Sequence, residues 1–212
     1  MRCQLRRVDV LRIDHFRALA AHWAVPAGAP DARSGAWRRT PGRALLKALQ
    51  NELSVLPFVA EDLGFITADV EALRKRFRLP GMRVLQFGFG GDSDNPHLPH
   101  MYRHNSVVYT GTHDNDTTVG WFSSLDHETR RRVESYLGTD SLMPGALIRA
   151  VCASVSALAV VPVQDLLGLG SEARLNTPGT VQGNWSWKLP AHALTHELAQ
   201  HFVALNRLYA RA

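Results

Sequence analysis

The sequence has few cysteines and no long apolar run. Cys3 and Cys152 are its only cysteines, so a disulfide framework is excluded as the source of its stability. Cys152 lies in a short apolar segment, where we expect a buried free thiol. No segment is apolar over enough residues to span a bilayer, and the N-terminal residues contain no apolar signal core. We therefore expect a cytoplasmic protein without a membrane partner.

Low-complexity segments and fixed-period repeats are also lacking. The 11 prolines and 16 glycines are spread along the chain instead of being concentrated in a linker. With 45% hydrophobic and 20% charged residues among 212, the composition is typical of an ordinary globular protein. We expect one domain, covering residues 1–212.

The net charge of +5 raises the question of nucleic-acid binding. The basic residues form no tail, and their short clusters stand beside apolar residues at helical spacing or beside acidic neighbours. The clusters are Arg6-Arg7, Arg38-Arg39, Arg74-Lys75-Arg76 and Arg130-Arg131-Arg132. We interpret them as solvated helix faces and expect no nucleic-acid partner.

Short apolar runs alternate with longer segments of helical pattern, which is typical of an α/β protein with a parallel sheet. The continuous apolar character of the runs suits strands that are buried on both faces. We predict strands at 8–13, 57–60, 82–87, 106–110 and 158–163. We predict helices at 42–53, at a segment capped by Thr67, after Asp126, at 146–157 and at 193–209.

Acidic residues follow three of the predicted strands, two of them directly and the third after Gly111-Thr112-His113. Asp14, Glu61 and Asp114 occupy these positions. In a (β/α) barrel the loops after the strands form one rim, where residues far apart in sequence converge. A complete barrel has eight strands and about 250 residues, so we expect a partial (β/α)8 TIM barrel, the C-terminal half of a catalytic barrel domain whose N-terminal half is missing.

Two carboxyl groups flanking a scissile bond are the requirement of glycoside chemistry. Arg12 precedes Asp14 by two positions, so both side chains lie on one side of an extended strand and the guanidinium stabilises the ionised carboxylate. Asp14 is therefore the better nucleophile and Glu61 the better acid. Asp114 supplies a third carboxylate that favours positive charge on a sugar ring, and His113 is placed to bind a sugar hydroxyl.

Structural interpretations compete with these roles. Arg12 and Asp14 would also make a buried ion pair at a strand end. Asp62 is more simply a structural hydrogen-bond acceptor, because its side chain points away from that of Glu61 in strand geometry. Arg174 and Asn176 follow the last predicted strand, and whether they reach the pocket stays open. Trp185 is the tryptophan that we expect at the rim.

Metal binding is the other alternative. His113, Asp114 and Asp116 have ligand chemistry, but no second cluster at a recognised spacing accompanies them. The segment 92–95 resembles the opening of a calcium loop but lacks its glycine and closing glutamate, so we interpret it as a polar turn. We expect no metal site.

Five motifs in order resemble those of the amylomaltases, the 4-alpha-glucanotransferases of glycoside hydrolase family 77. The motifs are Arg12-Ile13-Asp14-His15-Phe16-Arg17, Ala60-Glu61-Asp62-Leu63-Gly64, residues 80–87, residues 109–118 and Asn176-Thr177-Pro178-Gly179-Thr180. The resemblance implies that Asp14 is the nucleophile, Glu61 the general acid and base, and Asp114 the transition-state stabiliser. Arg12 and His113 would bind substrate beside them, and no cofactor is implied.

The same resemblance implies transfer of an α-1,4-glucan segment to glucose or to a maltooligosaccharide. Only eleven residues precede Arg12, whereas family members carry the first barrel strands there. A truncated, inactive remnant with weak glucan binding is therefore the alternative to an active transferase that uses a separate N-terminal half or self-association. A hydrolytic relative of the α-amylases is a third possibility, which the transferase motifs disfavour.

Overall fold

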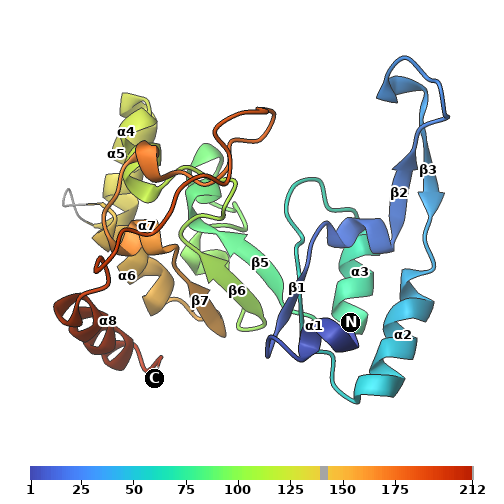
Figure 1. Cartoon of the computed structure of the whole chain (residues 1–212), viewed down its shortest axis with the longest axis horizontal. Helices are drawn as coiled ribbons and strands as arrows, with labels where there is room; N and C mark the ends of the chain where they lie inside the picture. Colours follow the sequence, from blue (N-terminus) through green and yellow to red (C-terminus); the bar gives the residue numbers. More distant parts are fainter. Residues whose placement is uncertain (139–142, 212) are drawn as a thin grey trace. The chain divides into compact units, whose positions relative to one another are not determined.

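The computed structural model describes residues 1–138 and 143–211. It divides into two compact units (Figure 1). The first is Met1–Met82, and the second consists of the described residues of Arg83–Ala212. Strand β5 (Gly81–Val84) begins in the first unit and ends in the second. None of the described helices combines the length and the apolar composition that a membrane-spanning helix requires.

Parallel strands joined by helices form the first unit. β1 (Leu11–Ile13) pairs in parallel with β4 (Phe58–Ala60), and β4 pairs in parallel with the start of β5. Helix α2 (Gly42–Leu53) precedes β4, and α3 (Ala68–Arg76) joins β4 to β5. The α/β pattern predicted from the sequence is confirmed here, and the predicted bounds of α2 match the structure.

The core of the first unit lies between these strands and helices. Its buried side chains are Phe16, Leu46, Phe58, Ala60, Val70, Leu73, Phe77 and Leu79. On α2 the spacing of the leucines turns Leu46 inward, while Leu45 remains exposed. Each large side chain that is fully removed from water contributes about 1.5–3 kcal/mol. The core therefore fixes the strands from which the acidic residues emerge.

An antiparallel hairpin in the first unit was not predicted. β2 (Ala21–Ala24) pairs with β3 (Ala36–Arg39), and the side chains of both strands are at least partly exposed, so no apolar alternation marks them in the sequence. Trp23 packs edge-on against Trp37, with ring centroids 5.4 Å apart. Their packing stabilises the hairpin. The remaining short elements are α1 (Arg2–Leu5), η1 (Phe16–Leu19) and η2 (Ala32–Ser34).

The second unit contains another parallel pair, β6 (Ser106–Tyr109) and β7 (Leu158–Val160). Three helices lie between them in sequence: α4 (Thr118–Ser124), α5 (His127–Leu137) and α6 (Gly145–Ala153). The other elements are η3 (Leu85–Gly90), η4 (Pro99–Met101), α7 (Val163–Leu166), η5 (Ser171–Ala173) and α8 (His196–Leu208). A second core packs these helices against the strands, with Leu85, Phe89, Val108, Val133, Leu147 and Val151 among its buried members.

Arg211 joins the end of the chain to the end of α6. Its guanidinium donates hydrogen bonds to the carbonyl oxygens of Cys152 at 2.8 Å, Ser154 at 2.6 Å and Ser156 at 2.6 Å. The bonds to Cys152 and Ser154 satisfy carbonyls at the end of α6 that lack intrahelical partners, and the bond to Ser156 holds the segment before β7. Cys152 is 5% exposed, as predicted, and burial raises the pKa of its thiol.

Three predicted strands end earlier than expected, the one at 106–110 already at Tyr109. The strand predicted at 82–87 ends at Val84, because the chain turns into η3 at Leu85. The strand predicted at 158–163 ends at Val160, and Pro162, which has no N–H to donate to a ladder, precedes α7. Thr67 stands at the N-cap of α3 as predicted, but its hydroxyl donates to Asp69 and does not cap the helix.

His97 accepts a hydrogen bond from the last residue of β5, and only the neutral imidazole can accept it. The Val84 N–H donates to its Nδ1 at 3.1 Å. Burial, and to a lesser extent the nearby Arg83, lowers the pKa of His97 from 6.5 to about 4. The imidazole of His97 therefore binds a proton less readily in the folded state than in the unfolded chain. The free energy of unfolding consequently rises with pH between about 4 and 6.5.

We expect protonation of His97 to lower the free energy of unfolding as the pH falls from about 6.5 toward 4. The contribution of His97 is fully present above the unfolded pKa of about 6.5, and the difference from the folded pKa corresponds to about 3 kcal/mol. His97→Gln removes the titrating group, so its free energy of unfolding, measured by urea denaturation at pH 7 and pH 4.5, will depend less on pH. The exposed His127→Gln serves as control, and equal pH dependence in both variants would contradict the assignment.

Candidate active site

Asp14 and Glu61 leave the sheet at the same level. Ile13 and Ala60 are register partners in the parallel ladder between β1 and β4, and each acid is the next residue along its strand. The Glu61 N–H donates to the Ile13 carbonyl at 3.0 Å, and the Phe16 N–H donates to the Glu61 carbonyl at 3.1 Å. Because neighbouring strands lie about 4.8 Å apart, the ladder brings the backbones of both acids together at the carboxyl ends of the strands.

The turn after Asp14 is held by its neighbours. His15 has a φ of 45°, in the left-handed region, and the next residue, Phe16, is completely buried. This combination sends the chain back into the core one residue after the acid. The Asp14 side chain remains 75% exposed, so it is open to a ligand at the rim.

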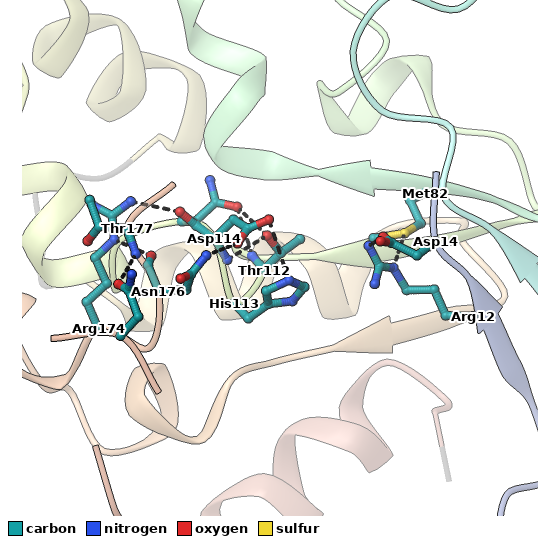
Figure 2. Close-up of polar contacts among 11 residues, drawn as sticks. Arg12, Asp14, Met82, Thr112, His113, Asp114, Arg174, Asn176 and Thr177 are labelled. Carbon is teal, nitrogen blue, oxygen red and sulfur yellow. Dashed lines mark hydrogen bonds and ion pairs between the residues drawn. The ribbon is translucent and has the colours of Figure 1, made fainter. Parts of the chain in front are cut away.

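Arg12 binds one oxygen of Asp14, as the sequence predicted. Its guanidinium contacts Asp14 Oδ1 at 2.6 Å, and its Nε contacts the sulfur of Met82 at 3.3 Å (Figure 2). A hydrogen bond between two charged groups is stronger than a neutral one and fixes geometry. The arrangement therefore orients the Asp14 carboxylate.

Glu61 and Asp62 point to different partners. Glu61 Oε1 accepts a hydrogen bond from the Leu63 N–H at 3.0 Å, while the Asp62 carboxylate accepts from the Met82 N–H at 2.7 Å and pairs with Arg74 Nε at 3.1 Å. The Asp62 and Arg74 side chains are 6% and 11% exposed. Asp62 is thus the structural acceptor that the sequence suggested.

Arg74 corrects one sequence interpretation. It was assigned with Lys75 and Arg76 to a solvated helix face, yet it is buried against Asp62 and also donates to the Leu79 carbonyl at 2.9 Å. The charges of the final turn do not reveal this, because burial depends on how α3 packs against the following strand.

Asp114 lies in the second unit, on the loop between β6 and α4. Its Oδ1 accepts a hydrogen bond from Asn176 Nδ2 at 2.6 Å, and its carbonyl accepts one from the Arg174 guanidinium at 2.7 Å (Figure 2). The Arg174 Nε also donates to the Asn176 carbonyl at 2.9 Å. The two residues whose position the sequence left open therefore hold the backbone and the side chain of Asp114.

His113 lies between Asp114 and an aromatic ring. Its Nε2 is 3.5 Å from Asp114 Oδ2, and its ring centroid is 5.3 Å from that of Trp185, with the planes tilted by 35°. Trp185 is 62% exposed. A flat apolar surface beside polar groups is the kind of surface on which a sugar ring packs.

The loop that carries Asp114 is held from inside by an acid that the sequence analysis missed. Asp165, 1% exposed, accepts hydrogen bonds from the hydroxyls of Thr110 and Thr118. The only signal in the sequence is a lone acid in a mostly apolar segment, which is costly unless it is hydrogen-bonded. A cavity of about 40 Å³ between Asp165 and His113 is too small for a sugar ring.

No metal centre is evident among residues 1–138 and 143–211, where no group of three or more His, Cys, Asp or Glu side chains is arranged to hold an ion. The expected site residues belong to the two different units of the chain. Arg12, Asp14 and Glu61 belong to the first unit, and His113 and Asp114 to the second.

The family model described as 4-alpha-glucanotransferase, glycoside hydrolase family 77, matches residues 1–195. The chain belongs to glycoside hydrolase family 77.

Relatives in the family align over almost all of the chain. A 4-alpha-glucanotransferase of Synechocystis is 47% identical over 99% of the chain and 42% of its own length, and one of Thermus thermophilus is 47% identical over 98% and 43%. An amylomaltase from Streptococcus agalactiae in complex with acarbose has a TM-score of 0.92 at 32% identity, over 99% of this chain and 43% of that one. This family 77 chain thus spans less than half the length of these relatives.

We expect the buried pair beside Glu61 to be essential for stability. Removing one partner of a buried ion pair typically costs about 3–5 kcal/mol, so Asp62→Asn should lower the free energy of unfolding by that order, as measured by denaturant titration. In α3, the helix that carries the Arg74 partner of Asp62, Glu71→Gln disrupts a half-exposed pair with Lys75. This change should cost less than about 1 kcal/mol. Equal losses in the two variants would refute the structural role of Asp62.

Proposed function

We propose that this chain carries the reacting carboxylates of a retaining 4-alpha-glucanotransferase. The observation that carries the proposal is the register of β1 and β4, which places Asp14 and Glu61 on adjacent parallel strands one residue beyond the partners Ile13 and Ala60. Retaining enzymes use two carboxyl groups about 5–5.5 Å apart, one as nucleophile and one as acid and base. Neighbouring strands suit such a short separation.

In the first step, Asp14 attacks the anomeric carbon of an α-1,4-glucan. The glycosidic bond breaks, Glu61 gives its proton to the departing 4-oxygen, and a covalent glucosyl ester forms on Asp14. Arg12 holds Oδ1 of Asp14, which leaves Oδ2 for the attack. The contact orients the nucleophile.

In the second step, the 4-hydroxyl of an acceptor sugar attacks the same carbon. Glu61, now ionised, takes the hydroxyl proton, and Asp14 leaves as a carboxylate, so the new bond has the configuration of the old one. The role proposed for Asp114 is to stabilise the positive charge of the sugar ring in both transition states. His113 and the exposed ring of Trp185 would bind the sugar.

The substrate class is proposed from the family. The relatives are named 4-alpha-glucanotransferases, and the amylomaltase of Streptococcus agalactiae has acarbose bound. In the second unit, a hollow of about 440 Å³ bordered by Arg174, Asn184 and Trp187 offers polar groups and one aromatic ring. Polar groups around an aromatic surface suit a sugar chain, which supports glucans as substrate.

The alternative is a truncated remnant that binds glucan without turning it over, because the chain covers only 42–43% of the relatives' length. We expect purified chain incubated with maltotriose to release glucose and to form longer oligosaccharides, followed by chromatography. Glucose with no longer product would instead indicate hydrolysis. Acarbose binding by calorimetry without turnover of maltotriose would support the remnant.

We expect Asp14→Asn to abolish the release of glucose and the formation of longer oligosaccharides, because the amide cannot form the covalent glucosyl ester. Glu61→Gln should lower kcat by about 10²–10⁴, the usual range for loss of a general acid and base. Asp9→Asn, at an exposed position of the same unit, serves as the matched control and should leave kcat unchanged. Full activity of a folded Asp14→Asn variant would overturn the mechanism.

A further inference from the structure

Asp165 is a buried acid with three hydrogen-bond donors around it. Its Oδ2 accepts from the Thr110 hydroxyl at 2.6 Å and from the Thr118 hydroxyl at 2.7 Å, and its Oδ1 accepts from the Thr118 N–H at 2.7 Å. Both threonines are completely buried. The hydrogen bonds from these three donors offset the cost of burying the polar side chain.

The two threonines are the two ends of the loop that carries Asp114. Thr110 directly follows β6, and Thr118 is the first residue of α4. A single carboxylate therefore fixes where the loop begins and where it ends. A hydrocarbon side chain of similar size would fill the space but would leave both hydroxyls and the N–H without this acceptor.

Gln164, the residue before Asp165, contacts the segment that binds Asp114. Gln164 is 4% exposed, and its Nε2 donates to the carbonyl of Ala173 at 3.3 Å. Ala173 immediately precedes Arg174, which binds the Asp114 carbonyl. One turn of α7 therefore contacts both the loop of Asp114 and the segment that holds Asp114 from the other side.

We infer that Asp165 is a positioning residue for Asp114. Its carboxylate fixes both ends of the loop 111–117, so that the loop presents Asp114 to Asn176 and Arg174 in one geometry. The inference rests on the proposed function, because it concerns the acid to which we assign transition-state stabilisation. Asp165 makes no contact with substrate in this role, so its loss should affect the chemical step more than ground-state binding.

The test compares Asp165→Asn with a matched control. The amide keeps an oxygen for the Thr118 N–H but replaces Oδ2 by a donor that faces two hydroxyls. We expect kcat with maltotriose to fall about 10–100-fold, with KM changed less than about twofold. Asp126→Asn is the control: Asp126 also accepts two N–H groups and a threonine hydroxyl at the start of a helix, and its loss should leave kcat unchanged.

Hydrogen exchange gives a readout that does not depend on turnover. We expect amide exchange of residues 111–118 to increase in Asp165→Asn, measured by mass spectrometry, while exchange in α5 and α6 stays as in the wild type. If the wild-type chain has no activity, the proposed function fails, yet this local change still supports the positioning role. Unchanged exchange in the loop, or an equal rise throughout the unit, overturns it.

A second pair of variants covers the case in which Asp165→Asn does not fold. Thr118→Val removes one hydroxyl donor and keeps the N–H bond, whereas Thr118→Ser keeps both donors. We expect faster loop exchange and, in an active chain, a lower kcat for Thr118→Val only. Equal behaviour of the valine and serine variants would overturn the inference.

Discussion

The parallel ladder between β1 and β4 is the constraint on which the candidate site depends. The Glu61 peptide donates to Ile13 and accepts from Phe16, so the chain must turn immediately after Asp14. His15 takes the left-handed conformation at this turn, which is unfavourable for a residue with a side chain. Burial of Phe16 and the ladder offset that cost. The positions of both acids are therefore set by the backbone.

Asp114 is positioned in a different way. It lies on a loop, and side chains from a later part of the chain determine its geometry: Asn176 and Arg174 bind it directly, while Asp165 binds both ends of the loop. Such a network is stabilising only when its buried members are satisfied. The two units thus use two devices for the same purpose, a strand register in one and a buried polar network in the other.

Much of the fold was predictable from local pattern. Continuous apolar runs identified the strands, of which β4 is buried throughout while β1 and β7 are partly exposed. Asp14 and Glu61 were found as the acids directly after such runs, and Asp114 as the acid on the loop after β6. The hairpin of β2 and β3 was missed because its side chains are at least partly exposed and no alternation marks it. Arg74 was assigned to the solvent because its pairing with Asp62 arises from packing.

The sequence alone indicated the family, through motifs in a fixed order, and the alternation of parallel strands with helices, through local patterns; it also selected the acids to which we assign roles. The tertiary structure alone decided that Asn176 and Arg174 hold Asp114, and that Asp165 fixes its loop. These partners are separated by 47 to 62 residues in the chain. Hydrogen bonds over such separations depend on how whole elements pack, which no local pattern specifies.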